Sequence, residues 1–217
     1  MNKIVAIDGP AGSGKGTIAA ILSERCNLIN IDTGATYRCV ALAALNNNLN
    51  IDDVDKIIEL SSKIKIEFTT DKRVLLDGVD VTCEIRSKEV TSIVSPISSI
   101  VEVRKNMVDL QRKMAENNDV VMEGRDITTV VLPKAKYKFY LDATLEERAK
   151  RRYKQYMEKG IDMSFEEIKE NIEKRDYNDM HKEVGSLIRT KDQVYIDSTN
   201  MTIEEVANQM IEVIRRG

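Results

Sequence analysis

The chain has 217 residues, a formal net charge of −3 and 42% hydrophobic residues. This length predicts one large domain, 1–217, or a domain with a substantial insertion. The acidic balance argues against a partner of nucleic acid or of an anionic membrane, so local cations must hold any anionic ligand. The chain opens on a strand-like run and has no membrane-length apolar segment, which predicts a cytoplasmic protein.

The cysteines give little sign of redox chemistry. Cys26, Cys39 and Cys83 are odd in number and form no C-x-x-C pattern. We expect reduced, mostly buried thiols.

The opening of the chain combines a strand, a glycine-rich turn and a helix. The apolar run Lys3–Asp8 precedes the turn, and a helical pattern follows over Ile18–Arg25. Such a unit presents backbone N–H groups to an anion at the positive end of a helix dipole. A bare turn without a ligand is the alternative, but this context predicts a nucleotide-phosphate site. Its residues are Gly9, Pro10, Ala11, Gly12, Ser13, Gly14, Lys15, Gly16 and Thr17.

Two side chains of this turn have separate roles. Lys15 can reach the β- and γ-phosphates, and a following hydroxyl can hold Mg²⁺. The common pattern has Ser or Thr directly after the lysine, whereas here Gly16 intervenes before Thr17. We therefore take Thr17 as the candidate metal ligand.

Five short apolar segments predict a buried parallel sheet. Most of them end in an acidic residue, and helical periodicity fills the connections. The segments are Lys3–Asp8, Leu28–Asp32, Asp119–Glu123, Tyr137–Asp142 and Val194–Asp197. Ligands of open sheets gather beyond the carboxyl ends of the strands. Candidate site residues therefore include Asp8, Asp32, Glu123, Arg125, Asp126 and Asp142.

Helix signals support this alternation of strands and helices. Ser or Thr is followed three positions later by Glu at Thr144, Ser164 and Thr202, as in a capping box. The segment Ser99–Asn117 reads as one long helix that leads into the third strand.

The stretch 46–90 breaks the rhythm and predicts an inserted α+β subdomain. It contains a helical pattern over Asp52–Lys63 and alternating patterns over Ile64–Thr70 and Arg73–Leu76. The pair Asp77-Gly78 between two apolar runs is a strong hairpin signal. The predicted fold class is α/β, with a five-stranded parallel sheet and this small insertion.

Two candidate clusters follow predicted strands. In Asp32–Arg38, Thr33 can cap the next helix, and Tyr37 and Arg38 project one turn further, where an arginine fork can grip a second phosphate. The alternative is a capped helix with a solvated arginine. In Glu123-Gly-Arg-Asp126, Arg125 has an electrostatic use beside phosphates; the alternative is a structural Arg125–Asp126 pair in a turn.

Two further clusters lie on helical patterns. Arg148, Arg151 and Arg152 share one face and can neutralise charge on a transferred phosphoryl group, although a solvated face is the ordinary interpretation. Arg175, Asp179 and Lys182 also share a face, and taken alone they predict a surface ion pair. The only histidine, His181, has no pattern that indicates catalysis.

Together these motifs resemble the bacterial cytidylate kinase family, which belongs to the P-loop nucleoside monophosphate kinases. The resemblance rests on the order and spacing of Gly9–Thr17, Asp32–Arg38, Glu123–Asp126, Thr129–Val131 and Ile196–Thr199 over nearly the whole chain. It implies a three-layer P-loop fold whose insert at 46–90 binds the monophosphate, with a helical lid at 148–182. It also implies transfer of the γ-phosphoryl group of ATP to CMP or dCMP, with Mg²⁺.

The resemblance also implies roles for single residues. Arg38 and Arg125 would hold the acceptor phosphate with Tyr37 and Thr33 beside it, and Lys15, Arg125, Arg148 and Arg152 would act in catalysis. A serine of Ser95–Ser99 (Ser98 is favoured), Arg104 and Asp126 would contact the base, and Arg175, Asp179 and Lys182 the ribose side. The region between Val94 and Arg104 is shorter than expected, and Lys182 replaces an expected arginine.

Cytosine is also favoured on physical grounds. Asp126 can accept a hydrogen bond from the exocyclic amine of cytosine, whereas uracil presents an oxygen there. No general base is needed, because the attacking phosphate is already ionised, and the lid and insert are expected to close and exclude water. The alternatives are a kinase for UMP, AMP or a metabolite hydroxyl, a nucleotide switch, and a nucleic-acid-binding ATPase. The sequence lacks the D-x-x-G and N-K-x-D motifs of guanine-nucleotide switches, and we expect a monomer.

Overall fold

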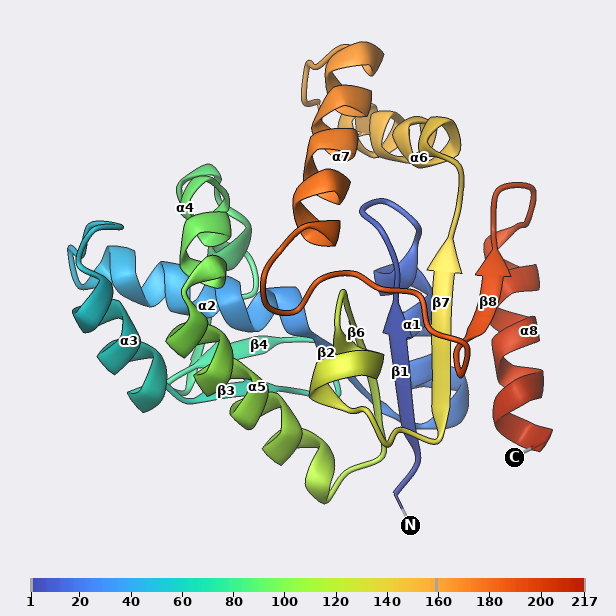
Figure 1. Cartoon of the computed structure of the whole chain (residues 1–217), viewed down its shortest axis with the longest axis horizontal. Coiled ribbons are helices and arrows are strands. Elements are labelled where there is room, and N and C mark those ends of the chain that lie inside the picture. The colour runs from blue at the N-terminus through green and yellow to red at the C-terminus, as the bar shows by residue number, and fades with distance from the viewer. Residues whose placement is uncertain (1, 159, 217) are drawn as a thin grey trace. The chain divides into compact units, whose positions relative to one another are not determined.

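The computed structural model describes residues 2–158 and 160–216 (Figure 1). The chain folds as two compact units. The terminal unit contains Ile4–Asn27 and the chain from Val121 onward, and the middle unit contains Leu28–Val120 with the residues before Ile4. The predicted insert 46–90 lies in the middle unit. The predicted lid 148–182 lies in the terminal unit and includes residue 159, which is outside the described residues.

The main sheet has the strand order β2-β6-β1-β7-β8. All five predicted strands are confirmed within one residue at each end: β1 (Ile4–Asp8), β2 (Ile29–Asp32), β6 (Val120–Gly124), β7 (Tyr137–Asp142) and β8 (Val194–Asp197). In the terminal unit, β7 pairs in parallel with both β1 and β8. The strands are continuous apolar runs because both faces are covered: Ile7, Phe139 and Leu141 are fully buried.

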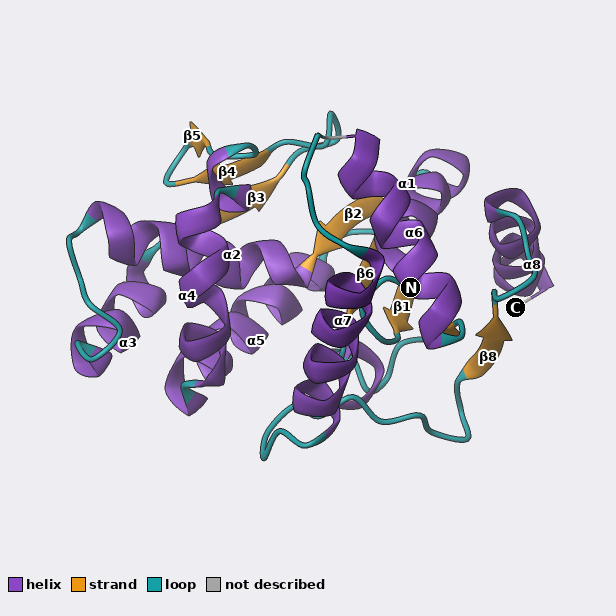
Figure 2. Ribbon diagram, turned by 90° about the horizontal axis from the view of Figure 1, so that it is seen from above, coloured by secondary structure: helices purple, strands orange, loops and turns teal. Residues whose placement is uncertain are grey.

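The helices of the terminal unit are α1 (Lys15–Cys26), α6 (Leu145–Glu158), α7 (Phe165–Met180) and α8 (Ile203–Arg216), with a π-helical turn, η2, at Ile127–Val131. Helices α6 and α7 pack side by side (Figures 1 and 2). The capping boxes at Ser164 and Thr202 are confirmed. The box at Thr144 is only half formed: its hydroxyl accepts from the Glu147 N–H, but its own N–H donates to Thr199 Oγ1.

The middle unit contains α2 (Thr33–Asn46), α3 (Val54–Lys63), a 3₁₀ turn, η1 (Glu84–Arg86), α4 (Lys88–Ser99) and α5 (Val101–Glu116). Its small antiparallel sheet has β3 (Ile66–Phe68), β4 (Val74–Leu76) and β5 (Val79–Asp80). The predicted hairpin is confirmed. Asp77 and Gly78 both have positive φ, 51° and 83°, as a type I′ turn requires.

Two expectations need correction. The long helix begins at Val101 and not at Ser99, because Ile100 is extended (φ −70°, ψ 120°) and separates α5 from α4. The cysteines are free but not mostly buried: Cys39 is buried, Cys26 half-buried and Cys83 exposed. Among the described residues, no helix combines the length and the apolar character needed to cross a membrane.

Candidate active site

The glycine-rich loop lies between β1 and α1 of the terminal unit, as predicted. Gly14 caps α1 with φ 96°, and Gly12 has φ 77°. Residues other than glycine rarely adopt these backbone conformations. Gly9 has a second constraint, since a Cβ added there would lie 2.0 Å from the backbone oxygen of Leu141 on β7. The loop can therefore approach the neighbouring strand only because Gly9 has no side chain.

Lys15 lies inside this loop. Its Nζ donates to the carbonyl oxygens of Gly9 and Pro10, both at 2.8 Å, and to Ser13 Oγ at 3.3 Å. Burial lowers the pKa of Lys15 to about 7, and the nearby Arg125 lowers it as well. The Lys15 side chain is thus buried in the loop, where little water would screen its attraction to a bound anion.

Asp8 connects the end of β1 to the turn that follows β6. Its carboxylate accepts hydrogen bonds from the N–H groups of Ile127 and Thr128 and from Thr128 Oγ1, at 2.6–2.9 Å. Burial raises the pKa of Asp8. These bonds fix the start of η2, directly after Arg125 and the buried Asp126.

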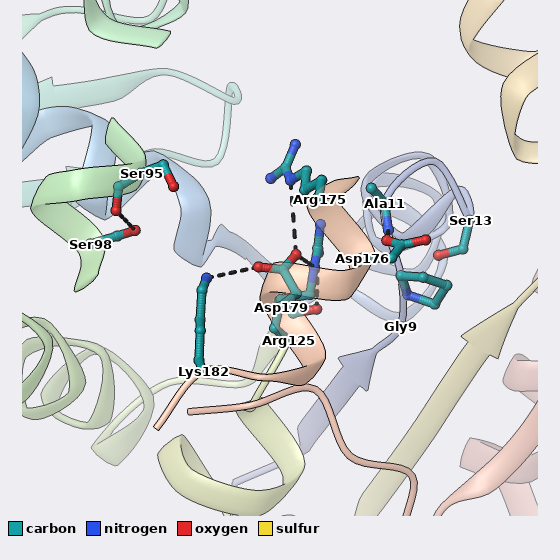
Figure 3. A network of polar contacts seen from close by, with 12 residues as sticks. Gly9, Ala11, Ser13, Ser95, Ser98, Arg125, Arg175, Asp176, Asp179 and Lys182 are labelled. Carbon is teal, nitrogen blue, oxygen red and sulfur yellow. Dashed lines mark hydrogen bonds and ion pairs between the residues drawn. The ribbon is translucent and has the colours of Figure 1, made fainter. Parts of the chain in front are cut away.

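Asp179 on α7 gathers three cations (Figure 3). It accepts from Arg125 Nε and from Lys182 Nζ, each at 2.7 Å, and Arg175 Nε lies 3.9 Å away. The predicted surface pair is wrong in one respect, because Asp179 is only 5% exposed. The carboxylate partner that the structure gives to Arg125 is Asp179, 54 positions away in the sequence.

The charges of this cluster stabilise one another. Burial alone would raise the pKa of Asp179, but Arg125 and Lys182 outweigh burial and lower it. Likewise, burial would lower the pKa of Arg125, yet the Asp179 carboxylate raises it. Asp179 and Arg125 are therefore both ionised, and Arg125 carries its full charge beside the candidate site.

The three arginines of α6 have different surroundings. Arg148 is buried and donates to the backbone oxygens of Ala11 and Ala143 and to Asp176. Arg151 is half-buried and contacts Ser13 O, Ser198 and Glu147. Arg152 stacks on the Tyr156 ring, with 5.7 Å from Cζ to the ring centroid. The interpretation of these arginines as one solvated face is therefore wrong for Arg148.

A small pocket of about 110 Å³ opens between α6, α7 and the loop. Arg152 and Arg175 enter it from the two helices, beside Ala11 of the loop. The rest of its lining is Tyr156, Met163, Ile168, Asn171 and Ile172. Two cations next to the loop suit a group with concentrated negative charge.

The middle unit holds the other predicted residues. Arg104 is buried and its Cζ lies 5.5 Å from the centroid of the Tyr37 ring, while its Nη1 donates to the Ser98 carbonyl oxygen. Arg38 donates to Thr91 Oγ1 and to the backbone oxygen of Ile85. The structure therefore brings Tyr37, Ser98 and Arg104 together, and it places Arg38 against η1 and α4.

The expected cap at Thr33 is wrong. Asp32 is the N-cap of α2 and accepts from the Ala35 N–H, whereas Thr33 is the first helical residue and is buried. Asp has a strong cap preference, and its position at the end of a strand hid this role. His181 stacks on the exposed Tyr177.

Sequence reasoning missed Asp176 and Gln111. Asp176 is buried and binds the loop, although it stands one position after Arg175 and looked like part of a charged helix surface. Gln111 Nε2 donates to Thr36 Oγ1 and joins α5 to α2. Its spacing of seven positions from Arg104 was the available signal, because it places both residues on one helix face.

The residues present fit a Mg²⁺ ion that is held chiefly by substrate phosphates and water. Thr17 is exposed on the first turn of α1, and a hydroxyl oxygen suits this hard cation. Within residues 2–158 and 160–216, no group of three His, Cys, Asp or Glu side chains could hold a metal ion. Mg²⁺ ordinarily keeps waters and binds substrate phosphates with few protein ligands, so a single hydroxyl is compatible with it.

A glycine-rich loop between a parallel strand and a helix, with a buried lysine inside it, defines a P-loop nucleotide-binding protein. Solved structures share the fold. A shikimate kinase from Bacteroides thetaiotaomicron matches with a TM-score of 0.51 and 11% identity, over 98% of each chain. One from Acinetobacter baumannii has a TM-score of 0.50 and 13% identity, over 100% of this chain and 94% of its own.

The particular family follows from sequence comparison. The cytidylate kinase family model matches residues 5–216, so the chain belongs to the cytidylate kinase family. A cytidylate kinase from Desulforamulus reducens is 49% identical over 100% of this chain and 98% of its own length. One from Enterococcus faecalis is 46% identical over 100% of this chain and 97% of its own length.

We predict that Gly9→Ala prevents ATP binding, because the new Cβ would meet the Leu141 oxygen at 2.0 Å and the loop backbone would have to move. Gly78→Ala is the control: it also places a side chain at positive φ, 83°, but finds no atom within 4 Å. Isothermal titration calorimetry measures ATP affinity, with circular dichroism as the check of folding. Equal ATP affinity in wild type and Gly9→Ala would contradict this role of the loop.

We also predict that ATP affinity falls as the pH rises above 7. With a pKa of about 7, Lys15 loses its proton above that pH, so binding of a polyanion must take a proton up. The expected change approaches tenfold in Kd per pH unit, between pH 7 and 9. Lys15→Met is the control, since it binds weakly and retains only the titration of the nucleotide. Wild-type affinity that does not change over this range would exclude the predicted proton uptake.

Proposed function

We propose how this chain carries out the reaction of its family, the transfer of the γ-phosphoryl group of ATP to CMP or dCMP. The observation that carries the substrate assignment is the match to cytidylate kinases over residues 5–216. The proposal concerns the residues that perform the reaction, and its support comes from the contacts within each unit.

On the donor side, the loop Gly9–Thr17 binds the phosphates of ATP. Its backbone N–H groups and the α1 dipole attract the anion, and Lys15 exchanges its bonds to Gly9 and Pro10 for phosphate oxygens. Thr17 would hold Mg²⁺, which would supply positive charge beside the phosphates of ATP. The support for this assignment is the buried, preformed position of the lysine.

On the acceptor side, Arg38 and Arg125 grip the phosphate of CMP with Tyr37 and Thr33 beside it. Ser98, Arg104 and Asp126 read the base, and Arg175, Asp179 and Lys182 serve the ribose side. Two observations favour these roles: Arg104 is preoriented on the Tyr37 ring, and Asp179 already holds Arg125 and Lys182. Lys182 supplies charge without the bidentate geometry of an arginine.

The chemistry is an in-line attack of a CMP phosphate oxygen on the γ-phosphorus of ATP, which breaks the bond to the β,γ-bridging oxygen and releases ADP. No general base is needed, because the attacking oxygen is already ionised. The protein contributes position and positive charge. Arg152 and Arg125 are the guanidinium groups that stabilise the charge spreading over the transferred group. Arg152 suits this role because its partner is a neutral ring, not a carboxylate.

Several wider assignments are part of the proposal. The segment 46–90 is the monophosphate-binding insert and 148–182 is the lid of a single kinase domain, 1–217. CMP and dCMP are the partners, not nucleic acid or membrane, and the protein is a cytoplasmic monomer.

A panel of acceptors tests the proposed substrate class. We expect ATP-dependent ADP release to be fastest with CMP or dCMP and at least tenfold slower with UMP and AMP, since the base-reading groups match cytosine. A coupled ADP assay measures initial rates at equal monophosphate concentrations. A faster reaction with AMP or UMP would contradict the base assignment, and GTP binding without transfer would favour a nucleotide switch.

A separate prediction concerns Asp126. Asp126→Asn replaces an acceptor oxygen by an amide that can face the oxygen of uracil, so discrimination between CMP and UMP should fall about 10- to 100-fold in kcat/KM. Asp109→Asn on α5 is the control, because it removes an exposed carboxylate that has no assigned role. Unchanged discrimination in a folded, active Asp126→Asn enzyme would remove Asp126 from the base site.

A further inference from the structure

The backbone of Ala11, at the tip of the glycine-rich loop, is held from both sides by charged side chains. Its N–H donates to Asp176 Oδ1 at 2.9 Å, and its carbonyl oxygen accepts from Arg148 Nη1 at 2.9 Å. Arg148 Nη1 also donates to Asp176 Oδ2, which closes the arrangement. We call Ala11, Arg148 and Asp176 the tip clamp; Figure 3 shows Asp176 beside Ala11.

The tip clamp is buried. The side chains of Arg148 and Asp176 are each 9% exposed, and Ala11 is 2% exposed. Water therefore screens these bonds little, and the loss of either charge would leave the other buried without compensation. This separates the tip clamp from the Lys169–Glu146 pair between the same two helices, whose side chains are 43% and 49% exposed.

The surroundings of the tip clamp leave the loop little freedom to move. Arg148 Nε donates to the Ala143 carbonyl oxygen, so the guanidinium is fixed at three points. A Cβ added at Gly12 would lie 3.3 Å from Arg148 Cβ, which shows how closely the loop approaches α6. Ala11 also packs in an apolar cluster with Ala149, Ile168 and Ile172. Helices α6 and α7 together thus determine where the loop tip lies.

This arrangement matters for binding because the loop has to present backbone N–H groups in one fixed geometry. The Ala11 N–H points to Asp176, so the phosphates of ATP are left to the N–H groups further along the loop. A free loop tip could turn its amides in many directions and would have to be ordered by each ATP molecule, at a cost in affinity.

We propose that Asp176 is a positioning residue for the donor nucleotide, and that Arg148 acts with it through Ala11 and not on the transferred phosphoryl group. This inference rests on the proposed function, in that the loop is taken as the ATP site. Asp176 itself has no contact with the reacting atoms in this role. Its effect is on the affinity for ATP, with the acceptor side left unchanged.

The test uses two variants of the tip clamp and one matched control. Asp176→Asn keeps an oxygen for the Ala11 N–H but removes the charge that Arg148 needs. Arg148→Lys keeps the charge and loses the guanidinium fork that spans Ala11, Ala143 and Asp176. The control, Glu146→Gln, weakens an exposed ion pair between the same helices, Lys169–Glu146 at 3.3 Å, which does not touch the loop.

The primary measurement is ATP binding at equilibrium, by isothermal titration calorimetry without any monophosphate. We expect Kd for ATP to rise about 10- to 100-fold in both tip-clamp variants and less than twofold in Glu146→Gln. In steady-state assays KM for ATP should rise in the same way, while KM for CMP stays within twofold. Thermal unfolding is recorded for each variant, since a merely structural role would lower Tm and leave the ATP affinity of the folded protein unchanged.

The outcomes separate this inference from the proposed function. Wild-type ATP affinity in both folded tip-clamp variants overturns the inference, as does an equal rise in KM for ATP and for CMP. If Asp176→Asn does not fold, Arg148→Lys decides alone. If the wild type binds ATP but phosphorylates no cytidine monophosphate, the proposed acceptor is wrong, while the binding series still decides whether the tip clamp positions the loop.

Discussion

The structure of the terminal unit depends on one constraint: positive charge must be kept inside the protein, beside a loop that has no side-chain carboxylate of its own. Lys15, Arg125 and Arg148 are all largely buried, and their charges are compensated in two different ways. Lys15 donates to backbone carbonyls and has a lowered pKa, whereas Arg125 and Arg148 each pair with a carboxylate of α7. Because a buried charge without a partner is costly, α7 is tied to the site by these two pairs.

The same constraint explains why glycines are needed where they occur. Backbone groups can replace carboxylates around Lys15 only if the chain turns tightly, and Gly12 and Gly14 reach φ values that other residues rarely adopt. Gly9 is needed for space as well, since β7 passes 2.0 Å from where its Cβ would be. The backbone conformation of the loop therefore determines which groups can surround the charge of Lys15.

Much of the fold could be predicted because its signals are local. Apolar runs gave the five strands within a residue, and Asp77-Gly78 gave the hairpin. The glycine-rich loop and its lysine could be predicted for the same reason, because they form one contiguous motif. By contrast, the partners of the charged residues could not be predicted, because they depend on contacts over long sequence distances: Asp176 binds Ala11 across 165 positions, and Arg125 binds Asp179 across 54. Helix-face spacing alone made Asp179 a surface residue, and only the packing of α7 buries it.

The fold supplies the phosphate-binding loop, but it does not select the substrate that accepts the phosphoryl group. Shikimate kinases share the fold at 11–13% identity, so the strand–loop–helix architecture does not determine the acceptor. Residues outside the loop must therefore select the acceptor, and α7 carries carboxylates that contact both the loop and the residues proposed for the acceptor side. Asp176 is turned to the loop, while Asp179, three positions later and nearly one turn away, holds Arg125 and Lys182. A substitution at Asp176 is therefore expected to change the affinity for ATP, and one at Asp179 the affinity for CMP. The two effects can be measured separately, because the two carboxylates lie on one helix but bind different partners.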